Sequence, residues 1–376
     1  MSNNSPMELL ISNSKLSDKL RQIAEKIVDR QRINEQDALL LYQESDLAFL
    51  GALANFVRVE KNGDNTYFNR NFHIEPTNIC IYNCKFCSYA RKINEEGAWE
   101  YSEEEILNKV KQYVGSGVSE VHIVGGVHPK RDLHYYGGLL KKIKTLIPDI
   151  HIKAFTAVEL EFMIKKSKLS LKEGLQTLKE YGLDSIPGGG AEIFNTEIRR
   201  KICDEKASSK MWLEIHETAH SVGLPSNATI LYGHIENYEH RIEHMKILRD
   251  LQDRTDGFNT FIPLKYRKEN NSMSQIGEVS LIEDLKNYAV SRIFLDNFPH
   301  LKAYWPGIGK SAAQASLAFG VDDLDGTIDD STKIYSLAGA EDQKPQMTTK
   351  QLVDLIKQAG KTPIERDTLY RTIKKY

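Results

Sequence analysis

Hydrophobic residues near the start of the chain recur at helical spacing. In a helix these residues would share one face. They are Leu16, Leu20, Ile23, Ala24, Ile27 and Val28. A second apolar run covers residues 47–57 and follows Ser45 and Asp46, whose side-chain oxygens suit the cap of a helix. The pattern therefore predicts a helical extension over residues 1–65.

After Asn62 and Gly63 the pattern changes to short apolar runs that end in polar or glycine-rich turns. Longer amphipathic segments, such as 102–114 and 282–297, separate these runs. Regular alternation of strand and helix predicts parallel βα units, and its extent predicts a closed or nearly closed TIM-type (βα) barrel, an α/β fold, over residues 66–329. A doubly wound open sheet is the alternative. The predicted strands cover residues 71–75, 120–124, 152–158, 183–186, 228–232, 260–264 and 301–305.

The remaining residues, 330–376, predict a helical tail that packs on the barrel, with one helix beginning at Thr348 and Thr349. Barrels of this kind place their chemistry in the loops after the carboxyl ends of the strands. We therefore expect the functional residues in those loops.

Composition and charge narrow the classes of function. With 40% hydrophobic and 27% charged residues in a chain of 376, the sequence suits a soluble globular protein with a large core. Lys and Arg number 50 against 52 for Asp and Glu, a net charge of −2 that gives no general attraction to nucleic acid or anionic lipid. Residues 1–15 are polar and no stretch reaches the roughly 20 apolar residues of a membrane span, so we expect a cytoplasmic protein without a membrane partner.

Cys80, Cys84 and Cys87 lie in one loop after the first predicted barrel strand. Such a cluster is unsuited to disulfides in a reducing compartment and indicates metal binding, with iron-sulfur or zinc favoured by soft thiolates. Three thiolates here suit three irons of one cubane and leave the fourth iron open to chelate a small ligand. The alternatives are a structural zinc site, for which no second Cys or His pair with matching spacing appears, and buried structural cysteines.

The segment from Cys80 to Cys87, CIYNCKFC, resembles the CxxxCxxC signature of the radical S-adenosylmethionine (SAM) superfamily. The resemblance implies a 4Fe-4S cluster whose open iron binds the methionine part of SAM, and cleavage of SAM to a 5'-deoxyadenosyl radical. Phe86 is then expected to pack near the adenine or simply to cover the cluster. Cys203, far from the motif, is expected to be a partly buried helix residue outside the cluster.

Gly125 and Gly126 follow the second predicted strand and lack side chains that would obstruct a ligand. In many radical SAM enzymes a similar site is Gly-Gly-Glu and binds the methionine amino group. Val127 replaces the acid in this chain, so the resemblance predicts only backbone contact.

A longer glycine run follows the fourth predicted strand. Its Gly189 and Gly190 would bring the backbone beside a nucleotide, and Glu192 would offer a carboxylate to ribose hydroxyls. A tight turn without a ligand is the alternative. Weaker candidates in comparable loops are His128, Glu159, His234 and Glu236.

From about residue 45 onward, several segments resemble the aminofutalosine synthase family of the futalosine route to menaquinone. They cover residues 73–80, 188–194, 322–327, 338–340 and 363–370. The cyclic dehypoxanthine futalosine synthases of the same pathway share the cysteine loop and the glycine run but lack a counterpart of residues 322–327, which favours the synthase.

This second resemblance implies addition of the adenosyl radical to 3-[(1-carboxyvinyl)oxy]benzoate, rearrangement and loss of bicarbonate, with SAM consumed as a substrate. It also implies an electron donor such as flavodoxin or ferredoxin. Two substrate carboxylates require cationic or hydrogen-bonding partners. A non-catalytic iron-sulfur or zinc protein is the alternative of another class, but it would not need an open coordination site beside glycine loops. Cations near predicted strand ends or adjoining helices are Lys265, Arg267, Arg292 and Lys302.

Overall fold

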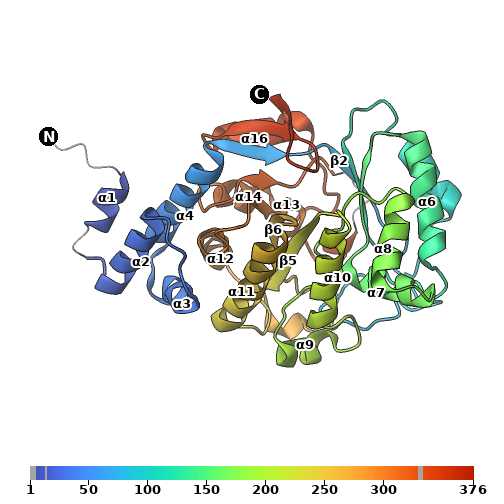
Figure 1. The fold of residues 1–376 in the computed structure, drawn as a ribbon, viewed down its shortest axis with the longest axis horizontal. Helices are drawn as coiled ribbons and strands as arrows, with labels where there is room; N and C mark the ends of the chain where they lie inside the picture. The colour runs from blue at the N-terminus through green and yellow to red at the C-terminus, as the bar shows by residue number, and fades with distance from the viewer. Residues whose placement is uncertain (1–5, 13–14, 329–332) are drawn as a thin grey trace.

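The computed structural model describes residues 6–12, 15–328 and 333–376, and its amino-terminal part is helical as expected. The helices are α1 (Pro6–Ile11), α2 (Asp18–Val28), α3 (Glu35–Glu44) and α4 (Leu47–Asn62). Side chains of Ser17, Asn34 and Asp46 cap the last three by accepting backbone N–H groups. Helix α4 packs along α12 (Leu281–Phe294), a helix of the barrel. Helices α1 to α4 together lie to one side of the barrel (Figure 1).

The barrel strands run parallel and follow one another in chain order. They are β2 (Asn71–Ile74), β3 (Glu120–Ile123), β4 (His151–Ala154), β5 (Ser226–Tyr232), β6 (Phe258–Lys265), β7 (His300–Ala303) and β8 (Asp323–Leu324). Between β4 and β5, Ser185 and Ile186 supply a strand position through single bridges to Lys153 and Ser226. The parallel barrel predicted from the sequence is therefore confirmed.

Side-chain hydrogen bonds close the barrel between β8 and β2. The Thr327 hydroxyl donates to the Asn71 carbonyl at 2.8 Å and accepts from the Asn71 N–H at 3.0 Å. The Thr327 N–H also donates to the Asn69 carbonyl at 3.2 Å. One threonine after β8 thus takes the place of a regular strand ladder.

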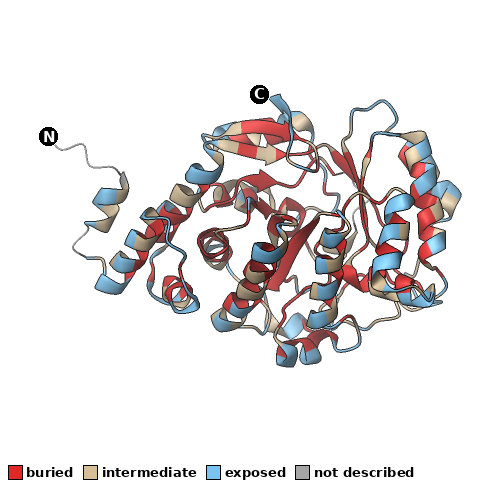
Figure 2. Ribbon diagram, viewed as in Figure 1, coloured by how far each residue is buried: buried red, intermediate tan, exposed pale blue. Residues whose placement is uncertain are grey.

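Amphipathic helices surround the strands and bury their apolar faces against them (Figure 2). They are α5 (Glu103–Lys111), α6 (Leu133–Leu146), α7 (Ala157–Lys166), α8 (Leu171–Glu180), α9 (Thr196–Cys203), α10 (Ser209–Ser221), α11 (Tyr238–Thr255), α12, α13 (Trp305–Ile308) and α14 (Lys310–Ser316). No helix within the described ranges is both long and apolar enough to cross a bilayer.

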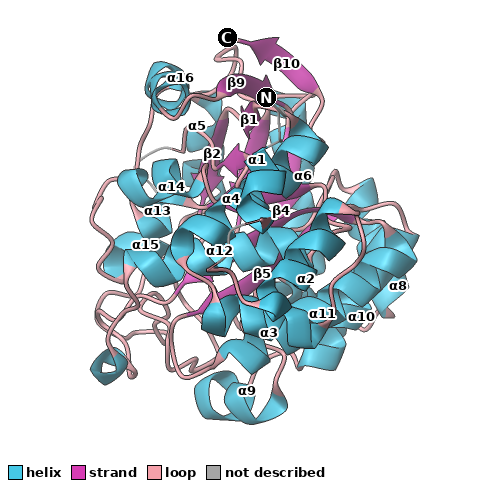
Figure 3. Ribbon diagram, turned by 90° about the vertical axis from the view of Figure 1, so that its left-hand side faces the viewer, coloured by secondary structure: helices cyan, strands magenta, loops and turns pink. Residues whose placement is uncertain are grey.

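The carboxyl-terminal part differs from the helical tail that the sequence predicted. It has α15 (Ile334–Leu337) and α16 (Thr349–Gln358), the latter capped by Thr348 as expected, but continues as β9 (Thr362–Arg366) and β10 (Thr372–Lys375). Strand β9 pairs with β1 (Asn65–Phe68), which itself pairs with β8 (Figure 3). Strands β9 and β10 are short and contain charged residues. Pairing with the distant β1 stabilises β9, and β10 pairs with β9. Residues 330–332 of the predicted tail lie outside the described ranges.

Residues 366–370 lie beneath the barrel, at the amino ends of its strands. Arg366 forms an ion pair of 2.7 Å with Asp323, the first residue of β8. The Thr368 hydroxyl donates to Glu120 at 2.8 Å, and the Tyr370 hydroxyl donates to Asp323 at 2.6 Å. Polar side chains of the last segment therefore satisfy carboxylates at the base of the barrel.

Two predicted strands are shorter than expected because helices begin inside them. Thr156 and Glu159 form a capping box that starts α7, so the strand predicted over 152–158 ends at Ala154. Trp305 likewise belongs to α13 and not to the end of β7. Strand β8 itself was not predicted, because its acidic sequence lacks the apolar run typical of a buried strand.

Candidate active site

A cavity of about 280 Å³ lies inside the barrel toward the carboxyl ends of the strands. Side chains on or just after every barrel strand contribute to its wall. This is the location expected for the chemistry of a parallel barrel. Of the predicted site residues, those that line the cavity are Phe86, Cys87, Gly125, Gly189, Gly190 and Glu192.

The cysteine loop after β2 is held in place through its backbone. The N–H of Ile81 donates to the Val127 carbonyl at 3.1 Å, and the N–H of Lys85 donates to the Ile202 carbonyl at 2.8 Å. The Lys92 ammonium donates to three carbonyls of the loop, with distances of 3.1, 2.8 and 3.3 Å. These bonds fix the loop between the end of β3 and the end of α9.

The thiols of this loop form a donor set suited to a cluster with three cysteine ligands. All the cysteines are free, and Cys80, Cys84 and Cys87 are only partly buried. Burial raises the pKa of Cys84 to about 12. Burial also raises the pKa of Cys80, although backbone N–H groups near the Cys80 sulfur act in the opposite direction. The Ala90 N–H donates to the Cys87 sulfur at 3.4 Å. Within the described ranges, no three His, Cys, Asp or Glu side chains gather around one point as a single metal ion would require.

Lys206, which was not among the predicted site residues, joins the cysteine loop to the glycine run. Its ammonium forms an ion pair with Glu192 and lies 5.1 Å from the centre of the Phe86 ring. Burial opposes its charge, but Glu192, Cys84 and Cys203 raise the pKa of Lys206 overall. Cys203, at the end of α9, is buried beside Cys84.

Gly125 and Gly126 allow β3 to end against the start of the cysteine loop. A Cβ atom on Gly125 would lie 2.9 Å from the Thr77 carbonyl oxygen, and one on Gly126 would lie 2.3 Å from that of Ile79. Gly126 lies at a separate small pocket beside His128, away from the main cavity. Close packing of the backbone therefore accounts for both glycines, and only Gly125 is placed to contact a ligand in the cavity.

The glycine run that contains Gly189 and Gly190 bends along another part of the cavity wall, which Lys206 connects to the cysteine loop. Gly190 has a φ of 92° and Glu192 a φ of 47°, in the left-handed region where a non-glycine residue is uncommon. The Leu231 N–H donates to the Glu192 carbonyl at 2.7 Å, which helps to hold this conformation. The turn thus places the Glu192 carboxylate at the cavity and beside Lys206.

Three of the predicted cations line the cavity, together with Lys153, which the sequence did not single out. The Lys153 ammonium lies 2.6 Å from Glu120, that of Lys265 lies 2.8 Å from Asp284, and that of Lys302 lies 2.9 Å from Asp325. Arg267 lies 3.2 Å from Glu278. Each positive charge on the wall is therefore accompanied by a carboxylate.

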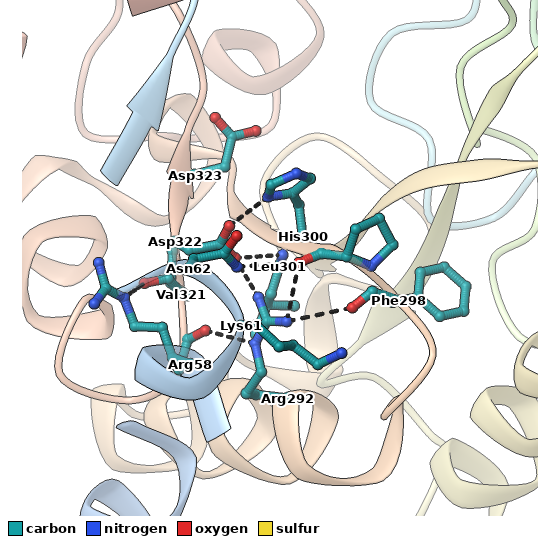
Figure 4. A network of polar contacts seen from close by, with 12 residues as sticks. Arg58, Lys61, Asn62, Arg292, Phe298, His300, Leu301, Val321, Asp322 and Asp323 are labelled. Carbon is teal, nitrogen blue, oxygen red and sulfur yellow. Dashed lines mark hydrogen bonds and ion pairs between the residues drawn. The ribbon is translucent and has the colours of Figure 1, made fainter. Parts of the chain in front are cut away.

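Arg292, the fourth predicted cation, does not reach the cavity. It is buried at the amino ends of β7 and β8, where it pairs with Asp322 and donates to the Gly320 carbonyl at 2.8 Å (Figure 4). Asp322 also contacts His300 and accepts the Leu301 N–H at 2.8 Å. The prediction that Arg292 could bind a substrate carboxylate is wrong, because its side chain holds the base of the barrel together.

Polar residues inside β2 and β3 also line the cavity and were missed. His73 and His122 lie in register on these strands, with ring centres 4.7 Å apart. Glu75 accepts the Lys333 N–H at 2.9 Å, and burial raises the pKa of Glu75 to about 7. Polar residues at alternate positions of an apolar strand are the signal that could have identified them, since alternate residues share one face.

The weaker loop candidates have local partners outside the main cavity. Glu159 accepts the Gly125 N–H at 3.1 Å and caps α7. His128 lies 3.3 Å from Glu100, and His234 lies 3.2 Å from Glu236. These contacts indicate that the residues stabilise the loops in which they lie.

Two family models together cover most of the chain. The model described as the radical SAM superfamily matches residues 74–248, and the model described as the CofH/MqnC C-terminal region matches residues 255–375. The second match includes β9 and β10, the strands that the sequence pattern did not predict. The region beneath the barrel is thus part of a recurring domain.

Similarity to curated proteins extends over nearly the full length. The aminodeoxyfutalosine synthase of Thermus thermophilus is 45% identical over 95% of this chain and 96% of its own. The protein of the same name from Streptomyces coelicolor is 39% identical, covering 95% and 94% of the two chains. Among solved structures, methylornithine synthase (PylB) has a TM-score of 0.73 at 18% identity, covering 91% of this chain and 97% of its own, a likeness of fold.

Proposed function

Because this chain belongs to the aminodeoxyfutalosine synthase family of radical SAM enzymes, we propose that it joins the adenosyl group of SAM to 3-[(1-carboxyvinyl)oxy]benzoate. In the proposed reaction SAM is consumed, the carbon skeleton rearranges and bicarbonate is lost, giving 6-amino-6-deoxyfutalosine for menaquinone synthesis. The proposed compartment is the cytoplasm, and the proposed electron donor is a small redox protein such as flavodoxin or ferredoxin.

One observation carries the proposal: the cysteine loop, the glycine run and the buried cations meet around one cavity. We propose that Cys80, Cys84 and Cys87 hold a 4Fe-4S cluster, which supplies the electron that cleaves the C–S bond of SAM when bound. With a cluster held by this loop, the part of the cavity lined by His73, His122 and Lys153 would remain for a second small molecule. All other tasks fall to the residues of the cavity wall.

The part of the wall next to the cysteine loop suits the adenosine of SAM. Gly189 and Gly190 allow the backbone to approach a nucleoside, and Glu192 offers a carboxylate to its ribose hydroxyls. Lys206 fixes the orientation of Glu192 through their ion pair and packs over Phe86. We propose that these residues orient the adenosyl C5' toward the interior of the barrel, where the vinyl carbon must lie.

The interior of the barrel suits the benzoate substrate. The cavity wall combines apolar contacts with cations on β4, β6 and β7, as an aromatic dicarboxylate requires. Enclosure by the strands excludes bulk water and so protects a reactive organic radical from side reactions.

The decisive experiment is anaerobic turnover of the reconstituted protein with SAM, dithionite and 3-[(1-carboxyvinyl)oxy]benzoate, followed by mass spectrometry. We expect a product that contains both the adenosine and the benzoate carbons. Only 5'-deoxyadenosine and methionine would reject this substrate and direct the test to the reaction of the cyclic dehypoxanthine futalosine synthases. No cleavage of SAM by protein with an intact cluster would favour a non-catalytic metal protein.

A further inference from the structure

Two polar atoms among the described residues of the cavity wall have no hydrogen-bond partner although solvent does not reach them. They are Nε2 of His122, on β3, and Nε of Arg267, just after β6. Buried polar atoms are nearly always hydrogen bonded, because an unpaired one costs about 1–3 kcal/mol. Because both residues line the cavity, a molecule that occupies it is the nearest source of partners, and it reaches the two atoms once their side chains turn toward it.

The other cations of the wall are committed to carboxylates of the protein. Lys153, Lys265 and Lys302 each lie within 2.9 Å of a buried acid, at 2.6, 2.8 and 2.9 Å respectively. An incoming carboxylate would compete with those partners at close range. The carboxylate beside Arg267, that of Glu278, lies 3.2 Å from Nη1, so an incoming carboxylate would meet no direct competitor at Nε, nor at His122 Nε2.

Arg267 is held so that this one donor stays unpaired. Its Nη1 lies 3.2 Å from Glu278, and its Nη2 donates to the Gly339 carbonyl at 2.6 Å. Both terminal nitrogens are thus anchored to the protein while the Nε–H remains. A guanidinium fixed in this way loses little conformational entropy when it binds a carboxylate.

The two atoms lie on facing parts of the wall and at different depths. Strands β3 and β6 are separated by β4, the bridge at 185–186 and β5 in one direction and by β7, β8 and β2 in the other. His122 belongs to the body of β3, whereas Arg267 follows the last residue of β6. A ligand that reaches both atoms must therefore extend across the cavity and along the barrel.

The loop that carries Arg267 is joined to the cysteine loop. The Ser272 N–H donates to the Lys85 carbonyl at 2.9 Å, and the Ser88 hydroxyl donates to the Glu269 carbonyl at 2.6 Å. Arg267 is thus on the cluster side of the cavity, and His122 is on the side away from it. The vinyl carbon of the proposed substrate must lie on the cluster side, where SAM is cleaved.

We propose that Arg267 Nε binds the carboxylate of the vinyl group and that His122 Nε2 binds the carboxylate of the benzoate. The assignment rests on the proposed function and names the residues that orient its substrate. Burial, with His73 and Lys153 nearby, lowers the pKa of His122, so its imidazole is neutral, and the proposal requires the tautomer that carries its hydrogen on Nε2. The two contacts would align a rigid aromatic dicarboxylate with its vinyl end toward SAM.

The test measures binding to the reconstituted, unreduced holoenzyme by calorimetry. The ligands are the full substrate, 3-(vinyloxy)benzoate, which lacks the vinyl carboxylate, and 2-phenoxyacrylate, which lacks the benzoate carboxylate. The variants are Arg267→Gln and His122→Phe, with Arg254→Gln as a matched control because Arg254 is exposed on α11. Cluster absorbance and thermal unfolding verify that each variant is folded, and Arg267→Lys and His122→Gln replace any that is not.

We expect Arg267→Gln to weaken binding of the full substrate and of 2-phenoxyacrylate at least tenfold and to leave 3-(vinyloxy)benzoate unchanged. His122→Phe should give the opposite selectivity, with 2-phenoxyacrylate unchanged. The assignment would be overturned if the variants lost affinity for all three ligands alike. It would also be overturned if each variant showed the selectivity expected of the other. The SAM affinity should not change in either variant, and a loss confined to SAM in Arg267→Gln would mean that the bound carboxylate is that of methionine.

Failure of this assignment can be distinguished from failure of the proposed function. If the wild-type enzyme binds the full substrate and forms the adduct while the variants show no selective loss, only the assignment is wrong. If the wild-type enzyme cleaves SAM but neither binds nor converts the full substrate, the proposed function fails and the assignment fails with it.

Discussion

Arg292 and Arg267 were both candidate cations in the sequence, but they lie at opposite ends of the same barrel. Every nitrogen of the Arg292 guanidinium has a partner, namely the Asp322 carboxylate and the carbonyls of Phe298, Pro299 and Gly320 (Figure 4). Arg267 has partners for its terminal nitrogens but none for Nε. A guanidinium whose nitrogens all have protein partners stabilises the fold. A guanidinium with one unpaired buried N–H can still donate to a ligand.

The same contrast separates two acids on the last barrel strand. Asp322, at the amino end of β8, is surrounded by Arg292, His300 and a backbone N–H. Asp325, just after the carboxyl end, lines the cavity and pairs with Lys302. The base of the barrel is therefore electrostatically complete, and the cavity is where the protein retains groups for small molecules.

The largest expected effect concerns the two neighbouring thiols, one partly exposed at the cysteine loop and one buried. Cys84→Ser should abolish cluster binding and all SAM cleavage, because the proposed cluster would lose one of its three proposed protein ligands. Cys203→Ser should keep both. Iron and sulfide quantification with a SAM cleavage assay checks this pair, and the reverse outcome would show that the ligand set is wrongly assigned.

Separate substitutions of the two arginines should have different effects on the stability of the fold. Arg292→Leu should lower the free energy of unfolding by about 3–5 kcal/mol, because it leaves the buried Asp322 without its main partner. Arg267→Gln should cost about 1 kcal/mol or less, since its ion pair with Glu278 is partly exposed. Urea unfolding of both variants measures the difference, and equal losses would remove the distinction drawn between the two sites.

The smallest expected effect is a difference in pH dependence between the two regions. Burial alone would raise the pKa of Asp322, but Arg292 and His300 lower it, so its contribution to stability is present above the unfolded pKa and is lost as pH falls. Burial raises the pKa of Glu75 to about 7, so the folded state prefers the protonated form and loses stability as pH rises from the unfolded value toward 7.

Glu75→Gln should remove this loss. Between pH 5 and pH 8 the wild-type protein should lose up to roughly 3 kcal/mol relative to the variant. Urea unfolding of both proteins at the two pH values gives the comparison. A constant difference across this range would show that Glu75 is ionised in the folded protein.

The sequence predicted those parts of the fold that depend on local patterns. The apolar run before Cys80 and the glycines after the fourth strand position mark the ends of barrel strands, and the structure brings Phe86, Cys87 and Glu192 to one cavity as expected. Strands β1, β8, β9 and β10 escaped prediction because they are short and lack an apolar run. Pairing between segments far apart in the chain stabilises β1, β8 and β9, whereas β10 pairs with its chain neighbour β9.

Contacts between segments far apart in the chain also explain the errors at the site. Lys206 lies in an ordinary charged segment, and only the folded chain shows that it pairs with Glu192. Arg292 sits on a helix beside a predicted strand end, but the direction of its side chain depends on the position of Asp322. His122 was overlooked because the polar residues of its strand, Glu120 and His122, were not assigned to a face.

The position of residues 362–370 has a consequence for how the protein is made. A ribosome releases the chain from its amino terminus, so Glu120 and Asp323 emerge before the Arg366, Thr368 and Tyr370 that satisfy them. Until that last segment emerges, β1 also lacks its neighbour β9. The barrel base is therefore completed only after residues 362–370 have been made, and a chain cut short before residue 362 lacks these partners and is less stable, which increases its exposure to proteolysis.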